Sequence, residues 1–446
     1  MKKGLRNSVI AMIEKTHFRI FKYNLSEDMK IFLGNMSYAG ISSVITAVML
    51  GILQIVAVRA LGPVEYGKVS LVFTVANFVP YLMFMGIHSG LSKYLPEKDP
   101  PGQQGIIITT SMLGILFFTC LTLTVSYLAR NYISEMLNFD MAVYSVGIIY
   151  CVFTVFKTST ESILRGLLKF KTQAILDVSY TSIAFLIFFV MYLLGYGGSY
   201  IAYICSFSAG LLIYSVSVLV WHKQYLRISF WKISKFKTLL SYGIYSVIGS
   251  IALFVLWGSD RFFISKYLDL QSVGIYSVYY GASLIILGRF SSILIKVLFP
   301  TASGRPDKAE INKSLSKLMF IGFIPLFLLN FGIMLIMLRI YGNQYPFNLT
   351  WVILFSINAI LYTYINSRGT LLVSQGVKGY AFYSFWSTCM AIFAFILYLA
   401  MIPPFGITGA IIAVIIVSFI FFIGLSYYTH NLFLREKKMS SSKLYM

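Results

Sequence analysis

The chain has 446 residues, of which 58% are hydrophobic and only 11% are charged, and its mean hydropathy is +0.80. Soluble domains carry about 25% charged residues, so this composition excludes a soluble globular protein. The formal net charge of +21 does not indicate nucleic-acid binding, because no basic stripe belongs to a soluble module. Apolar runs of roughly 20 residues recur along the chain, and runs of this length cross a bilayer as helices.

The first thirty residues form a basic segment without an apolar core, so we expect no cleavable signal peptide there. Apolar residues recur at helical spacing at Val9, Ile10, Ile13 and Ile20. This spacing is equally compatible with an interfacial amphipathic helix and with a solvated basic tail, so both interpretations stay open.

The apolar runs predict an all-α integral membrane protein with about twelve transmembrane helices in two six-helix halves. Turn residues such as Gly62-Pro63 separate the runs. The predicted spans are residues 31–58, 67–92, 105–129, 140–165, 174–194, 198–221, 238–265, 271–298, 314–338, 349–369, 379–402 and 406–430. The predicted parts are a basic N-terminal segment (1–30), a first half (31–221), a basic linker (222–237), a second half (238–430) and a tail (431–446).

The distribution of basic residues gives the expected orientation. If both termini are cytoplasmic, 27 of the 36 Lys and Arg residues lie in cytoplasmic segments, five in external segments and four within spans. Cytoplasmic segments of membrane proteins carry such an excess of basic residues. We therefore predict that both termini lie in the cytoplasm and that the net charge reflects topology.

The chain resembles itself at a shift of just over two hundred residues. Gly67-x-x-Ser70 matches Gly274-x-x-Ser277, and Arg165-Gly166 matches Arg368-Gly369. Because the matches fall on corresponding spans, they predict two parallel repeats. Parallel repeats are a transporter architecture, in which the substrate path lies between the two halves.

Motifs of soluble enzymes are missing from the sequence. It contains no Gly-rich phosphate loop with its lysine, no nucleophile elbow and no His/Cys cluster at metal-ligand spacing. Cys120, Cys151, Cys205 and Cys389 all lie in apolar runs, so we interpret them as packing residues. We expect no enzyme activity, no cofactor, no metal and no nucleic-acid partner.

Ionisable side chains inside a membrane are costly and usually face a cavity or a charged partner. Lys157 and Glu161 lie four residues apart in the fourth span, so they share a face of its helix. Arg289 and Lys296 lie seven apart in the eighth span and also share a face. These cations predict a water-filled cavity for an anionic group, although Lys296 could instead extend to the cytoplasmic edge.

The adjacent residues Asp260 and Arg261 add two further charges at the end of the seventh span. Arg261 is a candidate for the same cavity, and Asp260 and Glu161 are candidates for a coupling ion. The alternative is a set of buried ion pairs, Lys157 with Glu161 and Asp260 with Arg261 or Arg289.

The second span carries Asn77 and His88 on a narrow arc of its helix. His88 is a candidate proton relay, and a hydrogen-bonded packing histidine is at least as good an interpretation. Asn77 is a candidate cavity residue, and the favoured alternative is that it joins helices by hydrogen bonds. The candidate site therefore comprises the cations Lys157, Arg261, Arg289 and Lys296, with Glu161, Asp260, His88 and Asn77 as coupling or polar residues.

Three motifs resemble those of a known family. Arg59-Ala-Leu-Gly-Pro-Val-Glu-Tyr-Gly67 resembles an A-R-x-L-G-P-x-E-Y-G segment, and Asp260-Arg261-Phe-Phe-Ile-Ser-Lys-Tyr-Leu268 resembles its counterpart in the second half. Arg165-Gly166-Leu-Leu-Lys-Phe170 resembles the motif after the fourth span. The chain is thus similar to the polysaccharide-synthesis, or oligosaccharide flippase, branch of the multidrug/oligosaccharidyl-lipid/polysaccharide exporter superfamily.

The resemblance implies a flippase that moves a polyprenyl-diphosphate-linked oligosaccharide from the cytoplasmic to the external leaflet by alternating access. It places the protein in surface polysaccharide or glycan biosynthesis, in the plasma (inner or cytoplasmic) membrane. The implied substrate is a lipid-linked oligosaccharide, and other glycan-assembly membrane proteins are candidate partners. A diphosphate needs buried cations, which agrees with the charges found within the spans.

Two other functions are weighed against this one. Residues 31–58 contain no Asp or Glu, whereas drug-exporting relatives generally bind a coupling cation on a membrane carboxylate. This departure disfavours the alternative of a cation-coupled small-molecule or drug exporter of the same superfamily. A membrane enzyme or scaffold of envelope assembly is disfavoured by the short external loops and by the repeat.

Overall fold

The computed structural model describes residues 27–96, 103–138, 140–223, 231–303 and 309–443. The described residues form thirteen helices and no strand, which confirms the all-α prediction. The basic N-terminal segment, on which the prediction of an amphipathic helix falls, lies largely outside the described residues.

The helices divide between the two predicted halves. Those of the first half are α2 (Glu27–Phe84), α3 (Ile87–Tyr94), α4 (Gln103–Leu128), α5 (Arg130–Leu137), α6 (Met141–Gly166), α7 (Phe170–Leu193) and α8 (Tyr200–Trp221). Those of the second half are α9 (Ile233–Trp257), α10 (Asp260–Tyr267), α11 (Leu270–Ser303), α12 (Ala309–Tyr341), α13 (Leu349–Val373) and α14 (Val377–Lys443).

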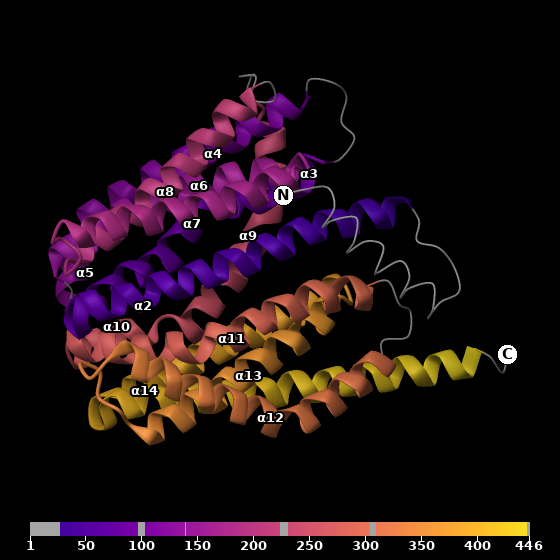
Figure 1. Cartoon of the computed structure of the whole chain (residues 1–446). Helices are drawn as coiled ribbons and strands as arrows, with labels where there is room; N and C mark the ends of the chain where they lie inside the picture. The colour runs from indigo at the N-terminus through magenta and orange to yellow at the C-terminus, as the bar shows by residue number, and fades with distance from the viewer. Residues whose placement is uncertain (1–26, 97–102, 139, 224–230, 304–308, 444–446) are drawn as a thin grey trace.

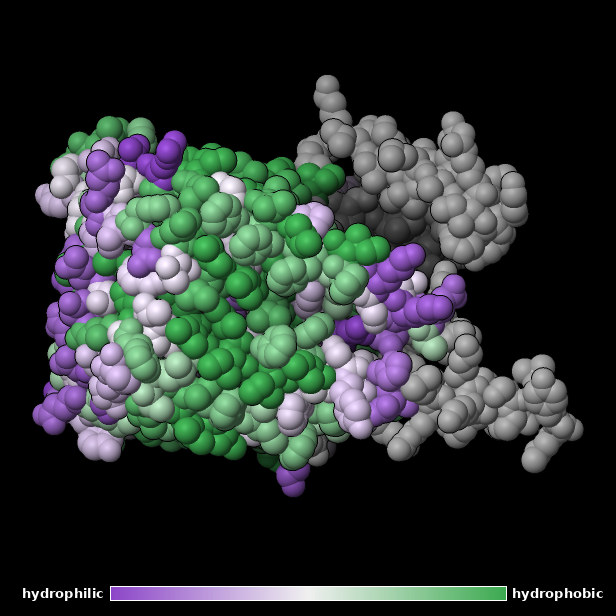
Figure 2. Space-filling view, turned by 90° about the horizontal axis from the view of Figure 1, so that it is seen from below, coloured by the Kyte–Doolittle hydropathy of each residue, from purple (hydrophilic) through white to green (hydrophobic). Residues whose placement is uncertain are grey.

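Ten of the described helices are long and apolar enough to cross a membrane. Two of their apolar stretches are much longer than one crossing needs, with 45 residues in Gly40–Phe84 and 54 in Gly379–Leu432. Each contains a break at a glycine with positive φ, Gly62 (φ 73°) and Gly406 (φ 57°). A left-handed backbone costs a glycine little, so these positions let the chain turn. Figure 2 shows the resulting apolar belt with hydrophilic residues at both ends.

Several predicted span boundaries are wrong. The predicted span 67–92 is interrupted, because Met85 and Gly86 have φ of 45° and 72° and separate α2 from α3. The span predicted over 238–265 is divided into α9 and α10 by a turn at Gly258 and Ser259. In addition, α9 begins at Ile233, inside the segment predicted as a linker.

The two halves lie close together at the end that holds α5 and α10, and they separate toward the end where the C-terminus lies (Figure 1). At the close end α2 crosses α11 at Gly67 and Gly274. A Cβ on Gly67 would collide with the carbonyl oxygen of Leu270, and a Cβ on Gly274 would collide with that of Pro63. The matched glycines of the predicted repeat are thus each other's neighbours, and the two backbones touch where both lack a side chain.

Ser70 and Ser277 meet just beyond the glycines, with their Oγ atoms 2.5 Å apart. Ser70 precedes Ser277 by 207 positions, and the same separation relates Gly67 to Gly274. Contacts between identical positions of two repeats are expected where a pseudo-two-fold axis passes between them. These contacts join positions that the predicted sequence repeat pairs.

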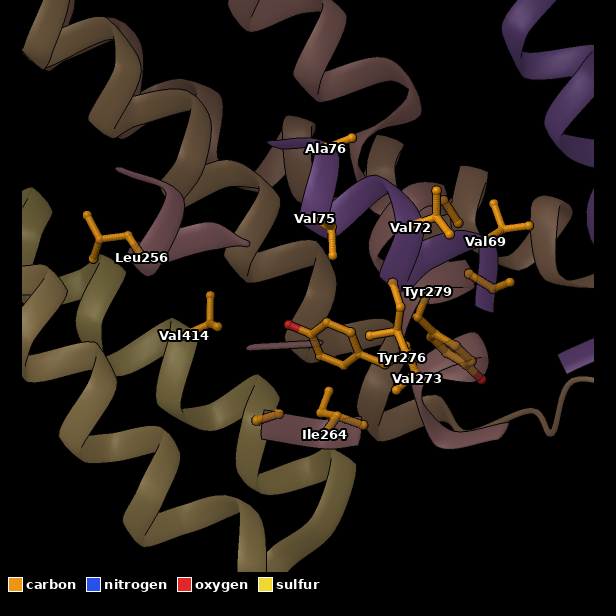
Figure 3. Packing of buried hydrophobic residues seen from close by; sticks show 14 of the residues in the cluster. Val69, Val72, Val75, Ala76, Leu256, Ile264, Val273, Tyr276, Tyr279 and Val414 are labelled. Atoms are coloured by element: carbon orange, nitrogen blue, oxygen red, sulfur yellow. The ribbon is translucent and has the colours of Figure 1, made fainter. Parts of the chain in front are cut away.

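A buried apolar cluster surrounds the crossing. Figure 3 shows Val69 and Val72 of α2 beside Tyr276 and Tyr279 of α11. All four side chains are at most 1% exposed. Burial of apolar area contributes about 25 cal/mol per Å² in water, but inside a lipid bilayer close packing takes over that role. Packing of α2 on α11 therefore holds the halves together at this end.

The four cysteines are free thiols. Cys151 is buried and Cys389 is half-buried, as expected for packing residues. Cys120 and Cys205 are exposed on the outer surface of the helices, so the packing interpretation is wrong for these two. In an apolar span a lipid-facing cysteine is as well accommodated as a buried one, and sequence alone does not separate them.

Candidate functional site

A charged cavity of about 370 Å³ lies where the halves separate. Its walls come from α2, α6 and α7 of the first half, and from Arg289 of α11 in the second half. The described residues that line it are Ser42, Ser43, Thr46, Lys157, Glu161, Arg165, Phe170, Gln173, Ala174, Asp177, Tyr180 and Arg289. The structure thus brings together Lys157, Glu161 and Arg289, three of the predicted site residues.

Helix α6 supplies three charges at successive turns. Lys157, Glu161 and Arg165 are four residues apart, so they lie one above another on a single face. Both cations donate to Glu161, Lys157 to Oε2 and Arg165 to Oε1. Gln173 of α7 donates to the same carboxylate at 2.9 Å. Glu161 therefore accepts hydrogen bonds from two cations and balances one of their two positive charges.

Helix α7 adds a second carboxylate, Asp177, which the sequence analysis did not single out. Its Oδ1 lies 3.9 Å from Nζ of Lys157. The lysine also lies over the rings of Tyr214, at 5.0 Å, and Tyr180, at 5.6 Å. The signal in the sequence was the spacing of Gln173 and Asp177, which puts both polar groups on one face of an otherwise apolar helix.

The charges that line the cavity do not balance. Lys157, Arg165 and Arg289 carry three positive charges, and Glu161 and Asp177 carry two negative ones. Arg289 has no ion pair or hydrogen bond with any residue that the structure describes, and its side chain is exposed at the cavity. An unpaired guanidinium at membrane depth is costly, so a site of this kind favours an anionic ligand.

The cavity wall also offers a hydroxyl group. Oγ1 of Thr46 in α2 is buried and has no hydrogen-bond partner among the described residues. Buried polar atoms are normally paired, and one left open at a cavity is a candidate contact for a polar ligand or water. Helix α2 therefore contributes only hydroxyl-bearing residues to the described lining of the cavity, namely Ser42, Ser43 and Thr46.

Asp260 and Arg261 form a separate cluster that does not line this cavity. Nη1 of Arg261 lies 2.9 Å from Oδ1 of Asp260, and Tyr276 donates its hydroxyl to the other carboxylate oxygen. The guanidinium carbon also lies 4.3 Å from the ring centre of Tyr280. Asp260 is fully buried and Arg261 is 9% exposed. This arrangement is the buried ion pair that was the alternative to a cavity role for Arg261.

His88 and Asn77 are not among the described residues that line the cavity. Lys296 lies on α11, but its side chain is outside the described part of the chain. Nε2 of His88 lies 3.2 Å from the hydroxyl of Ser89, and its ring packs 4.4 Å from Phe84. Asn77 is exposed and bonds to no described residue.

Comparisons with known proteins agree with this arrangement. The sequence matches the family model described as "Polysaccharide biosynthesis protein" over residues 32–306, which is more than half of the chain. No protein of curated function matches it. An inward-facing multidrug resistance MATE family transporter of the MOP superfamily is 14% identical with a TM-score of 0.67, over 88% of this chain and 96% of that one.

Two further solved structures share the fold. The lipid II flippase MurJ in an inward closed conformation is 14% identical with a TM-score of 0.67, over 92% of each chain. An outward-facing MATE family transporter is 15% identical with a TM-score of 0.52, over 91% of this chain and 96% of that one. The chain therefore superposes better on the inward-facing MATE structure than on the outward-facing one.

Identities this low show the fold alone, and the fold is one of transporters, as the sequence motifs implied. The family match covers the first half and the start of the second, including the motifs at Arg59 and Arg165. The chain is a member of the polysaccharide biosynthesis protein family, with the fold of the MATE and MurJ proteins of the MOP superfamily.

Proposed function

We propose that the protein is a flippase that carries a polyprenyl-diphosphate-linked oligosaccharide across the membrane. The observation that carries the proposal is the cavity with an unpaired Arg289 facing the cations of α6. A diphosphate offers the oxygens that a guanidinium binds through two parallel hydrogen bonds. The family assignment and the fold shared with MurJ, a flippase of lipid II, support the same substrate class.

Binding exchanges one set of ion pairs for another. Glu161 pairs with both Lys157 and Arg165, so an incoming diphosphate competes with this carboxylate for the two cations. A released Glu161, with Asp177 nearby, is then left with unbalanced negative charge inside the membrane. Such a carboxylate pair would take up a proton or a metal cation, which gives the site a means of coupling transport to an ion.

The topology follows from the two broken helices. We divide α2 at Gly62 and α14 at Gly406, which turns ten apolar stretches into twelve crossings. An even number of crossings and the excess of basic residues in alternate loops support cytoplasmic positions for both termini. The closed crossing at Gly67 and Gly274 then lies toward the external side, and the charged cavity lies toward the cytoplasm.

Alternating access in this arrangement moves the opening from one side to the other. The cavity takes Arg289 from the second half and its other charges from the first, so a relative movement of the halves changes the spacing of the cations. The sugar-diphosphate headgroup crosses between the halves while the prenyl chain remains in lipid. Membrane proteins of glycan assembly that make or use this substrate are the expected partners.

The alternative is a cation-coupled exporter of small molecules, and one observation favours it. Glu161 and Asp177 place two carboxylates in the cavity, although residues 31–58 contain none. A cationic drug would bind these carboxylates, whereas a diphosphate would bind Arg289. Replacing Arg289 should therefore impair transport by a flippase, and it should leave export of a cationic drug intact.

The function is tested in cells that lack the chromosomal gene and carry wild type, Arg289→Ala or Arg339→Ala on a plasmid. Arg339 is an exposed arginine at the far end of α12 and serves as the matched control. Lipid-linked glycans are measured separately in the two leaflets. We expect a lipid-diphosphate oligosaccharide to accumulate on the cytoplasmic side of the deletion strain and of Arg289→Ala, and to clear with wild type and with Arg339→Ala.

Normal surface glycan in the deletion strain, with no accumulated intermediate and no second copy of the gene, would overturn the flippase proposal. Export of a cationic drug that persists in Arg289→Ala and fails in Glu161→Gln would then establish the exporter alternative.

A further inference from the structure

We infer that the fissure between the first part of α2 and α7 is the lateral exit through which the hydrocarbon chain of the substrate leaves the charged cavity for the bilayer. The inference rests on the proposed function, because it needs a substrate with an anionic head and an apolar tail. It adds a site for the tail, which neither the charges nor the family motifs assign.

The fissure contains an apolar groove of about 220 Å³. Its described lining residues are Tyr38, Ser42, Ile45, Lys171, Ala174, Ile175, Val178 and Ser179. The exposed surface of the groove is almost entirely apolar, and Ile45 and Ile175 are 38% and 49% exposed at its mouth. Because α2 and α7 are both long and apolar enough to cross a membrane, this mouth faces lipid in the proposed arrangement.

The groove and the charged cavity adjoin each other and share two lining residues. Ser42 of α2 and Ala174 of α7 line both of them, so they form the boundary between the two spaces. Both residues are small and buried, so only a serine and an alanine side chain stand at this boundary. On one side of the boundary lie Lys157 and Asp177. On the other side, the described lining residues are apolar or carry hydroxyl groups, apart from Lys171.

This combination fits one kind of occupant. A ligand that fills both spaces must be anionic at one end and a hydrocarbon at the other, which describes a lipid with a phosphate or diphosphate head. Lys171 is exposed at the groove and adds a cation beside the head. A larger apolar cavity of about 530 Å³ between α2 and α4 shares no lining residue with the charged cavity, so it does not adjoin the charges in this way.

The inference is tested with a long-chain polyprenyl diphosphate that carries a photoreactive diazirine on its hydrocarbon chain. The purified full-length protein is placed in phosphatidylcholine nanodiscs, irradiated with the probe and digested for peptide mapping. We expect labelling of the segments 38–45 and 171–179. Labelling confined to other segments, such as those that line the larger apolar cavity, would overturn the inference.

Filling the groove supplies a second measurement. Val178→Trp and Ile175→Trp are expected to weaken binding of the polyprenyl diphosphate by about tenfold, because the indole occupies the space of the chain. Inorganic diphosphate, which has no tail, is expected to bind both variants as it binds wild type. Leu186→Trp, at a lipid-facing position of α7 that is 58% exposed, is the matched control and should bind both probes normally.

The two probes separate failure of this inference from failure of the proposed function. One outcome is that inorganic diphosphate binds and requires Arg289, but the tryptophan variants bind the long-chain probe normally. The proposed diphosphate site is then supported, and the inferred exit for the hydrocarbon chain between α2 and α7 is wrong. If neither probe binds the wild type, the proposed function fails and the inference fails with it.

Discussion

Two arginines of the charged cavity differ in what balances them. Arg165 shares Glu161 with Lys157, whereas Arg289 has no counter-charge among the residues that the structure describes. An arginine that is already paired gains less from a ligand phosphate, because it must give up one partner for another. Arg289 is therefore the residue whose loss should affect anion binding most.

We predict that Arg289→Ala weakens binding of inorganic diphosphate by about 10- to 100-fold, because a charged hydrogen bond contributes about 1.5–3 kcal/mol. Arg289→Lys should recover part of this loss, since a lysine keeps the charge and loses the two-pronged geometry. Isothermal titration calorimetry on the purified protein measures the difference, with Arg339→Ala as control. Equal affinities for wild type and Arg289→Ala would contradict the assignment.

The Asp260–Arg261 pair is assigned a structural role. Breaking a buried ion pair by removing one partner costs about 3–5 kcal/mol, because the other charge stays buried and unpaired. We predict that Asp260→Asn lowers the melting temperature of the detergent-solubilised protein much more than Glu135→Gln, which removes an exposed carboxylate on α5. The double variant Asp260→Asn with Arg261→Gln should recover much of the stability. Recovered stability without recovered transport would instead assign Arg261 to the substrate path.

Sequence reasoning at this scale found groups that share a helix and missed those that meet across helices. Lys157 and Glu161 were paired correctly from their spacing of four residues. Asp177 escaped notice because its partner Lys157 lies on another helix. Sequence alone also could not decide whether Asp260 pairs with its neighbour Arg261 or with Arg289 on another helix. The structure pairs it with Arg261.

At the scale of elements, the crossing of α2 and α11 is the contact through which the halves meet at the closed end. Glycine at positions 67 and 274 lets the two backbones touch, and the hydroxyls of Ser70 and Ser277 lie 2.5 Å apart. Alternating access requires this contact to open when the cavity faces the external side. A covalent link across it should therefore hold the protein in one state.

We predict that cysteines at both positions, Ser70→Cys with Ser277→Cys, form a disulfide under mild oxidation in a background without the four native cysteines. Transport should stop on oxidation and return with dithiothreitol, while Ser70→Cys alone should be insensitive to both treatments. Gel shift after maleimide labelling measures the bond. Full transport by the oxidised double variant would show that this end does not open.

The helices themselves were largely predictable, since long apolar runs have no other stable form in lipid. The positions at which the helices break were harder to predict from the sequence. Gly62-Pro63 and the Pro403-Pro404 segment predict turns from the sequence. Met85 and Gly86 have left-handed backbone conformations, but their sequence does not predict a break. Gly86 packs against the backbone of Gly243 on α9, so this break is set by a contact between distant segments.

At the scale of the whole molecule, the proposed topology makes opposite predictions for two exposed loops. Tyr196, in the turn between α7 and α8, is 64% exposed and should face the exterior. Leu168, in the turn between α6 and α7, is 57% exposed and should face the cytoplasm. We predict that a membrane-impermeant maleimide labels Tyr196→Cys in intact cells, and labels Leu168→Cys only after the cells are opened. The reverse pattern would invert the topology and the direction of transport.

The fold and the site together make one central claim, that a cationic cavity between two halves carries a lipid diphosphate across the bilayer. Proteoliposomes containing a fluorescent polyprenyl-diphosphate saccharide test it most directly, because a membrane-impermeant quencher reports how much of the lipid has changed leaflet. We predict rapid exchange with wild type and with Arg339→Ala, and exchange near that of protein-free vesicles with Arg289→Ala. Equal lipid exchange by Arg289→Ala and wild type would contradict the claim. The claim would also be contradicted if the correctly folded wild type exchanged no lipid under an imposed ion gradient.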